Sequence, residues 1–267
     1  MLSFNQCLYT FLDSKLDMNE PTKIALMIGL MIASAAVGYF LGSLNFAIML
    51  SKRFHHEDVR EHGSGNAGAT NMLRTYGKGM AALTLVGDML KCAIAILIGA
   101  LLWVDGAYIA GLFCVIGHVF PCWFHFRGGK GVAVAAAVIL MTSPIVFLLV
   151  ILVFAVIVLS TKYVSLASVM AALVYPVFLS SMNTVSGNEG SFNIIMAFLI
   201  TTIVVVMHRQ NIKRLLDKTE PKISLGKKKK QVEDVENDES ADDAEQTQQM
   251  TANYKRYQNK KSKKGNK

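Results

Sequence analysis

Apolar runs of about the length that crosses a bilayer recur along this chain from Thr22 to Met207. The hydrocarbon core of a membrane is about 30 Å thick, so a helix needs roughly 20 apolar residues to cross it. Inside lipid, backbone N–H and C=O groups must bond within the protein, and helices satisfy that requirement. The chain is therefore predicted to be an all-α integral membrane protein with several transmembrane helices.

Six apolar segments can be delimited, over residues 23–50, 80–104, 107–126, 132–160, 163–182 and 192–207. Their orientation follows from charge, because cytoplasmic loops of membrane proteins carry an excess of Lys and Arg. The connection after the first segment carries Lys52, Arg53, Arg60, Arg74 and Lys78. We therefore predict that this connection is cytoplasmic and that the N-terminus lies outside.

The number of crossings depends on the long run 132–160. An unbroken helix there would put Lys162 outside and leave the basic stretch 208–218 on the wrong face. Ser143-Pro144 interrupts the run, and proline disrupts a helix interior. Splitting the run into helices 132–142 and 145–160 returns Lys162 and the stretch 208–218 to the inside. The helix 132–142 is too short for a simple span. The prediction is a seven-helix transmembrane bundle with a cytoplasmic C-terminus.

Three regions of different composition follow one another along the chain. Residues 1–22 form a short N-terminal extension, residues 23–220 the membrane-embedded domain, and residues 221–267 a charged tail. The tail has almost no apolar content and is predicted to be disordered. The net charge of +8 does not indicate a nucleic-acid partner, because the basic residues gather at span ends and in the tail.

Residues 63–71 read GSGNAGATN, a loop of small and hydrogen-bonding residues. Glycines at 63, 65 and 68 permit positive φ and close approach of a ligand to the backbone. Successive N–H groups in such a turn can form an anion cradle. Ser64, Asn66, Thr70 and Asn71 add side-chain groups, and Arg74 can grip a phosphate through two donors. The loop predicts a phosphate site at the membrane surface, with a flexible polar connection as the alternative.

Three further polar stretches are predicted on the same side of the membrane. They are the turn Arg127-Gly128-Gly129-Lys130-Gly131, the stretch Thr161-Lys162-Tyr163 with Ser165 and Ser168 at the start of the next helix, and the stretch from His208 to Arg214. His208 and Asn211 are three apart and face the same way on a helix. A histidine can take a proton there and an asparagine can orient a hydroxyl. In the alternative interpretation, the Lys and Arg residues only mark the cytoplasmic side of the membrane, and the serines only donate hydrogen bonds to carbonyls of their own helix.

Ionisable residues inside the apolar helices have simpler interpretations. Asp88 and Lys91 are three apart and are expected to pair inside the bundle. His118 is a functional candidate by its position, but a neutral ring bonded to a carbonyl near Pro121 is preferred. Neither a carboxylate pair nor a His cluster indicates a metal, and we predict no metal and no cofactor.

The four polar stretches closely resemble a known family, the bacterial acyl-phosphate:glycerol-3-phosphate acyltransferases (the PlsY family). The matching stretches are GSGNAGATNMLR at 63–74, GHVFPCWFHFRGGKGVA at 117–133, TKYVSLAS at 161–168 and HRQNIKRLL at 208–216. The resemblance implies a seven-helix bundle in the bacterial cell membrane with its signature loops facing the cytoplasm. It also implies transfer of a fatty acyl group from acyl phosphate to the sn-1 hydroxyl of glycerol 3-phosphate. The products would be lysophosphatidic acid and inorganic phosphate.

The resemblance assigns roles to residues of this chain. It implies that the loop residues Ser64 to Asn71 receive the donor phosphate, and that Arg74 and Lys130 bind phosphates and offset negative charge. Ser168, His208 and Asn211 would hold glycerol phosphate. The expected catalytic set is Ser64, Arg74, Lys130, His208 and Asn211. The expected substrate-binding set is Gly63, Gly65, Asn66, Gly68, Thr70, Asn71, Gly128, Gly129, Gly131 and Ser168.

The expected partners are acyl phosphate, glycerol 3-phosphate, membrane lipid and an enzyme that supplies the acyl phosphate. The proton acceptor stays open between His208 and the donor phosphate. A transporter for a phosphate-bearing solute is the alternative function, because basic glycine-rich turns suit that too. A transporter usually places its polar site near the midplane between repeats, whereas these polar groups lie at helix ends and no repeat is visible.

Overall fold

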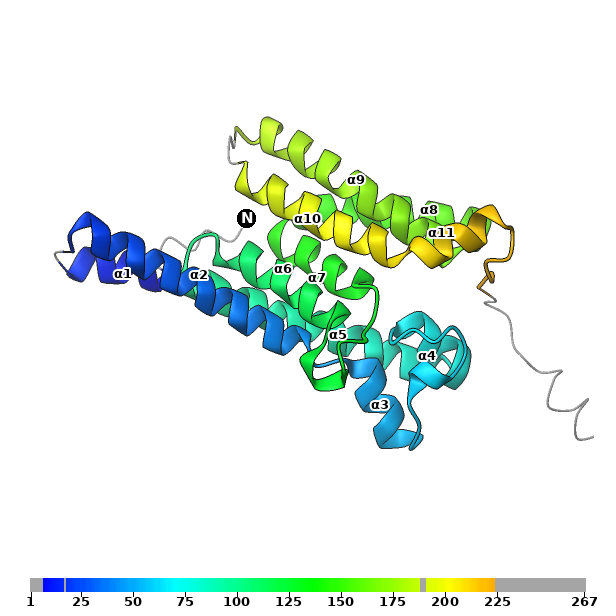
Figure 1. Cartoon of the computed structure of the whole chain (residues 1–267). Coiled ribbons are helices and arrows are strands. Elements are labelled where there is room, and N and C mark those ends of the chain that lie inside the picture. The colour runs from blue at the N-terminus through cyan, green and yellow to red at the C-terminus, as the bar shows by residue number, and fades with distance from the viewer. Residues whose placement is uncertain (1–6, 17, 188–190, 224–267) are drawn as a thin grey trace, which may run out of the picture. The chain divides into compact units, whose positions relative to one another are not determined.

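The computed structural model describes residues 7–16, 18–187 and 191–223, and every regular element in them is a helix (Figure 1). The longer helices are α2 (Glu20–Gly42), α5 (Lys78–Leu102), α6 (Gly106–Val119), α7 (Val132–Thr142), α8 (Pro144–Thr161), α9 (Val164–Val185) and α10 (Phe192–Met207). Short helices are α1 (Leu8–Lys15), α3 (Phe46–Phe54), α4 (Ala69–Tyr76) and α11 (Arg209–Leu216), with single turns η1 (Val59–Glu61) and η2 (Cys122–Phe124).

Several of these helices can cross a membrane by length and composition. Among the described residues five helical segments qualify, and the pair α10 and α11, bent by 55°, makes a sixth if it is one span. The helix α7 is apolar but shorter. The break expected at Ser143-Pro144 is confirmed, since α7 ends at Thr142 and α8 begins with Pro144. Proline is favoured there because the first turn of a helix needs no N–H from it.

The first apolar segment differs from the prediction of one helix over 23–50. The helix α2 already begins at Glu20, where the Asn19 side chain accepts from Thr22 N at 3.0 Å. It ends at Gly42, and α3 begins after Asn45, whose side chain accepts from Ile48 N at 3.1 Å. Buried Lys91 donates to the carbonyl oxygens of Gly42 and Leu44. These carbonyls lack a helical N–H partner because α2 ends at Gly42.

The expected helix 107–126 is also shorter in the structure. The helix α6 ends at Val119, and the chain then turns through η2. Pro121 explains the early end, because proline disfavours helical backbone in the residue before it. His125 and Phe126 follow with φ of +58° and +56°, in the left-handed region that residues other than glycine rarely occupy.

Close helix packing builds the bundle around α6 and α7. The helix α2 packs on α6 and α5, and α9 packs against both α8 and α10 (Figure 1). Gly38 lets α2 touch α6, since a Cβ at this position would collide with the backbone of Ala110. Buried side chains of α5, α6, α7 and α10 form the central core, among them Cys92, Val115 and Val138.

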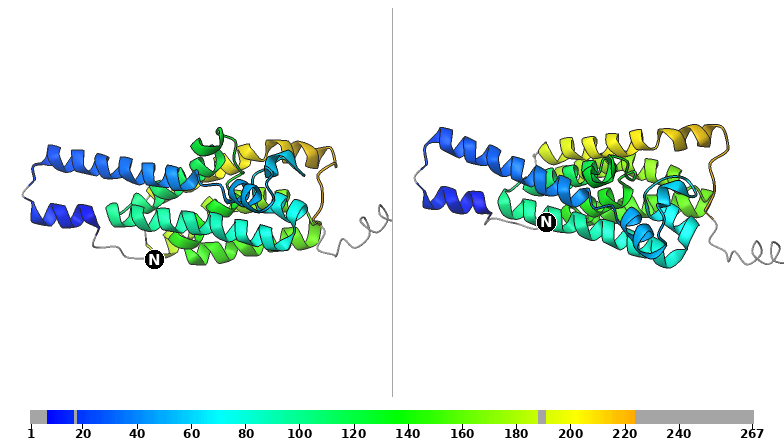
Figure 2. Two further views of the ribbon diagram at one scale, coloured as in Figure 1. Left: turned by 90° about the horizontal axis from the view of Figure 1, so that it is seen from below. Right: turned by 60° about the horizontal axis from the view of Figure 1, so that its bottom comes forward.

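The polar stretches gather at one end of the bundle. Both α4 and α11 lie there, whereas α1 and the start of α2 lie at the opposite end (Figures 1 and 2). The segment after α11 returns to the start of α9 at this end, where Ile223 N donates to Lys162 O at 2.9 Å. Most of the tail, residues 224–267, lies outside the described residues, so its predicted disorder stays a prediction.

Candidate active site

A cavity of about 570 Å³ opens among α4, α5 and α7 to α11. Eleven of the fifteen residues expected in the site line it: Ser64, Asn66, Gly68, Thr70, Asn71, Arg74, Lys130, Gly131, Ser168, His208 and Asn211. Four expected glycines, Gly63, Gly65, Gly128 and Gly129, are not among the described residues that line it. The structure thus brings the four polar stretches together around one space.

The glycine loop owes its shape to Asn71 rather than to glycine alone. The Asn71 side chain is buried, donates to Val59 O and His62 O at 2.9 and 3.0 Å, and accepts from Ser64 N at 2.9 Å. These bonds fold the loop back on α4, with Gly63 at a φ of +59°. Asn71 was expected to bind the donor phosphate, but its amide is already engaged in holding the loop.

The second glycine turn is packed against the first. Gly128 N and Gly129 N donate to the carbonyls of Val119 and His118, both at 3.1 Å. These two N–H groups therefore satisfy carbonyls at the C-terminal end of α6 and are not free to hold an anion. A Cβ on Gly129 would collide with the His118 ring and the Ala67 carbonyl, so only glycine fits between them.

Lys130 leaves this turn and points to the last helix. Its Nζ donates to Asn211 Oδ1 at 2.6 Å, and Asn211 Nδ2 donates to Glu220 Oε1 at 2.6 Å. The pKa of Lys130 is lowered to about 8, mainly by burial and also by the nearby Arg214 and Arg74, against the opposite effect of Glu220. The ammonium is thus poorly solvated and close to other cations, which favours an anionic ligand.

Glu220 was not a predicted site residue. It is buried, lines the cavity and accepts from Arg214 Nε at 2.8 Å as well as from Asn211. Burial by itself would raise the pKa of this carboxyl, but the bonds from Asn211 and Arg214 outweigh it and lower the pKa. Two carboxylates, Asp217 and Glu220, follow the basic helix α11, and the sequence does not indicate which of them enters the site.

The other predicted groups differ in how free they are. Arg74 donates to Pro221 O at 3.2 Å through one nitrogen. Ser168 Oγ donates to Val164 O at 2.9 Å, as the alternative interpretation predicted, and keeps its lone pairs. His208 Nδ1 lies 2.7 Å from Val204 O. Because a carbonyl only accepts, Nδ1 carries the proton there, and the neutral ring keeps Nε2 as an acceptor.

A buried charged cluster lies beneath the two glycine turns. Lys91 Nζ pairs with Asp88 Oδ1 at 2.8 Å, which confirms the expected pair. His118 Nδ1 lies 3.1 Å from Lys91 Nζ and 3.5 Å from Asp88 Oδ1. The preferred bond of His118 to a carbonyl near Pro121 was therefore wrong. Asp88 and His118 also line the cavity.

Most of the remaining cavity wall is apolar. It includes Leu85 and Met89 of α5, Phe147 and Val150 of α8, and Tyr175 of α9. The space therefore has a cationic, hydrogen-bonding region and a long hydrocarbon-like region in one cavity. In the part of the chain that the structure describes, no three His, Cys, Asp or Glu side chains are placed to hold a metal ion.

Known proteins are similar to this chain in sequence. Residues 32–218 match the family model described as glycerol-3-phosphate acyltransferase. A protein of that name from Clostridioides difficile is 41% identical over 205 residues, which cover 74% of this chain and 97% of the relative. A Rhizobium etli protein of the same name is 44% identical over 193 residues, which cover 72% and 91%.

Two solved structures have the same fold. One is a crystal structure of PlsY, an integral membrane glycerol 3-phosphate acyltransferase, in its glycerol 3-phosphate form. It is 37% identical, with a TM-score of 0.66, and the match covers 73% of this chain and 96% of that one. The lysophosphatidic acid form of PlsY gives 36% identity, a TM-score of 0.64 and coverage of 73% and 95%.

Proposed function

This chain belongs to the glycerol-3-phosphate acyltransferase family, and we propose that it acylates the sn-1 hydroxyl of glycerol 3-phosphate with acyl phosphate as the donor. The products are lysophosphatidic acid and inorganic phosphate. The observation that carries the proposal is the single cavity in which Arg74 and Lys130 share space with the apolar walls of α8 and α9. An acyl phosphate is an anion on a hydrocarbon chain, so this combination of walls suits it.

The donor phosphate belongs at the glycine loop. Gly68 precedes α4 without a side-chain cap, and the first backbone bonds of the helix run from Asn71 N and Met72 N to Gly68 O, so the N–H groups of Ala69 and Thr70 remain available to an anion. Ser64 and Thr70 line the cavity beside them. Arg74, one turn into the helix, supplies a guanidinium that can offset phosphate charge. The acyl chain then extends along Phe147 and Tyr175.

Glycerol 3-phosphate belongs beside Lys130, Ser168 and His208. Lys130 is held by Asn211, so its ammonium has a fixed direction toward a phosphate. Ser168 and the Nε2 of His208 can both accept a hydrogen bond from a glycerol hydroxyl. Asn211 would then act by holding Lys130, a change from the direct contact with substrate that the resemblance implied.

The reaction needs no covalent enzyme intermediate. The substrate hydroxyl oxygen attacks the acyl carbon, the bond from that carbon to the phosphate oxygen breaks, and inorganic phosphate leaves. The hydroxyl proton passes to His208 Nε2 or to the donor phosphate. Because the mixed anhydride is already activated, alignment and charge stabilisation by Arg74 and Lys130 supply the acceleration.

The proposal includes the membrane arrangement. Seven helical segments, an outside N-terminus and a cytoplasmic C-terminus would place the cavity mouth at the cytoplasmic face of the bacterial cell membrane, where glycerol 3-phosphate is available. It also includes the three regions 1–22, 23–220 and 221–267. In support, the basic residues Arg74, Lys130 and Arg214 all lie around one cavity end.

The test uses purified full-length protein in detergent with palmitoyl phosphate and glycerol 3-phosphate. We expect lysophosphatidic acid and phosphate to form in equal amounts. Palmitoyl-coenzyme A in place of palmitoyl phosphate should give no product, which controls for other acyltransferases. Phosphate release without lysophosphatidic acid, or no turnover, would refute the proposed function.

A further inference from the structure

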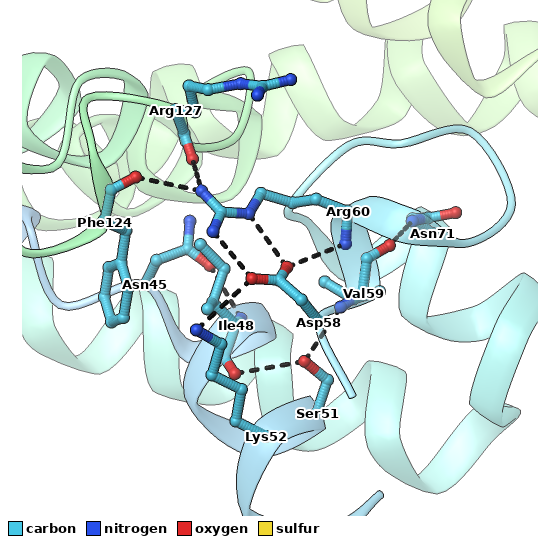
Figure 3. Close-up of polar contacts among 10 residues, drawn as sticks. All are labelled: Asn45, Ile48, Ser51, Lys52, Asp58, Val59, Arg60, Asn71, Phe124 and Arg127. Atoms are coloured by element: carbon cyan, nitrogen blue, oxygen red, sulfur yellow. Dashed lines mark hydrogen bonds and ion pairs between the residues drawn. The ribbon is translucent and has the colours of Figure 1, made fainter. Parts of the chain in front are cut away.

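The side chain of Arg60 joins the two glycine turns from outside the cavity. Arg60 lies in η1, just before the glycine loop, and its Nη1 donates to the carbonyls of Phe124 and Arg127 at 3.0 and 2.8 Å (Figure 3). Arg127 directly precedes the turn that carries Lys130. Arg60 thus links the segment before the glycine loop, in which it lies, to the segment before the turn of Lys130.

Asp58 fixes the direction of that guanidinium. Its two carboxylate oxygens accept from Arg60 Nε at 2.9 Å and Nη2 at 2.7 Å, and Oδ1 also accepts from Arg60 N at 3.1 Å (Figure 3). Both side chains are mostly buried, 17% exposed for Arg60 and 12% for Asp58. The hydrogen bond from Arg60 lowers the pKa of Asp58 to about 2, so the pair stays ionised at neutral pH.

The η1 turn is itself anchored on both sides. Val59 N donates to Ser51 Oγ of α3 at 3.2 Å, and Val59 O accepts from Asn71 Nδ2 of α4 (Figure 3). Lys52 also pairs with Asp58, at 3.5 Å, but its side chain is 53% exposed. Within the described part of the chain, Lys52 forms no hydrogen bond or ion pair with the segment 124–127. Arg60 therefore projects from a rigid base.

The segment that Arg60 grips needs external support. His125 and Phe126 lie between the two gripped carbonyls, and both have positive φ. Two consecutive residues other than glycine in that region cost energy, and such a conformation persists only where its surroundings enforce it. Bonds to Phe124 O and Arg127 O hold both ends of the strained pair.

We infer that Arg60 and Asp58 are positioning residues, which hold the segment 124–127 and thereby set the place of Lys130 opposite the glycine loop. Neither residue lines the cavity among the described residues. Lysine cannot replace Arg60 in this role, because one ammonium cannot pair with two carboxylate oxygens and also bond two carbonyls in a fixed plane. The inference rests on the proposed function only in its kinetic test, which measures acyltransferase turnover.

The test compares Arg60→Ala, Arg60→Lys and, as a matched control, Lys52→Ala. Lys52 contacts the same carboxylate but not the gripped segment, so its variant should keep wild-type turnover. A displaced Lys130 should lower kcat/KM of both Arg60 variants by about tenfold or more. Millimolar guanidinium should restore part of the turnover of Arg60→Ala and leave the wild type unchanged, which a merely structural loss would not show.

A second readout does not depend on catalysis. Trypsin cleavage after Arg127, followed by mass spectrometry, should become faster in both Arg60 variants and stay unchanged in Lys52→Ala. Faster cleavage with an inactive wild type would support the positioning role and refute the proposed function alone. Turnover within twofold of wild type in Arg60→Lys, unchanged cleavage after Arg127, or a loss in folded Arg60→Ala that guanidinium does not restore would overturn the inference.

Discussion

The protonation of Lys130 should control how the enzyme captures glycerol 3-phosphate. Burial lowers the pKa of this lysine to about 8. Below that pH the ammonium is present, and one unit above it only about a tenth of the molecules keep the charge. The ratio kcat/KM reports ionisations of the free enzyme. We therefore expect kcat/KM for glycerol 3-phosphate to decrease about tenfold for each pH unit above the pKa.

Saturating substrate should shift this dependence. A bound phosphate next to the ammonium favours its charged form and raises its pKa, so kcat should stay constant to a higher pH than kcat/KM. The assay measures lysophosphatidic acid formed from palmitoyl phosphate at a series of pH values and glycerol 3-phosphate concentrations. The pH at which kcat begins to decrease should be clearly higher than the pH at which kcat/KM begins to decrease.

The matched variant is Lys130→Arg. Arginine keeps its charge throughout the accessible pH range, so its profile should lack the decrease near the pKa of Lys130, whatever its absolute rate. A kcat/KM that stays constant through this region in the wild type would refute the assignment. The same decrease in Lys130→Arg would assign the ionisation to another group.

Three further changes have expected outcomes. Arg74→Ala should lower turnover about a hundredfold or more, the scale for loss of one donor to transition-state charge, as measured by lysophosphatidic acid formation. Lys91→Met should destabilise the protein by about 3–5 kcal/mol, seen as a lower melting temperature, because it removes the lysine partner of the buried Asp88 carboxylate. Deleting residues 224–267 should preserve specific activity, whereas deleting 219–267 should abolish most of it, since Glu220 is then lost.

Each of these changes has a control in the chain. Lys213 is an exposed cation on α11, and Lys213→Ala should keep the turnover that Arg74→Ala loses. Lys52→Met removes an exposed lysine and should leave the melting temperature within a degree or two of wild type. Wild-type turnover in Arg74→Ala, an unchanged melting temperature in Lys91→Met, or inactivity after deletion of 224–267 would each contradict the corresponding argument.

The sequence predicted the membrane class, the break before Pro144 and the convergence of the polar stretches. These follow from local rules: apolar run length, proline geometry and the distribution of cations. The end of α2 at Gly42 could not be predicted in this way. It depends on Lys91, a residue 49 positions away, which bonds the freed carbonyl.

The roles within the site were harder to predict for a similar reason. Spacing marks Asn71 and the glycines at 128 and 129 as candidates for anion binding, but it does not say which of their groups the fold already uses. In the structure the Asn71 amide and these two glycine N–H groups bond to nearby backbone. Arg60 contributes through partners more than 60 positions away, and Glu220 contributes through Asn211, which bonds Lys130 across 81 positions. Such pairings are visible only in the folded chain.

The most direct test of the central claim is the sidedness of the polar stretches in the native membrane. Single cysteines at Glu61, beside the glycine loop, and at Gln210, on α11, would be labelled with a membrane-impermeant maleimide in a cysteine-free background. Ser186, in the turn that follows α9 and is predicted to lie outside, serves as the control position. We expect positions 61 and 210 to react only in inside-out vesicles and position 186 only in right-side-out vesicles. Reaction of positions 61 and 210 from opposite sides would contradict a single shared site.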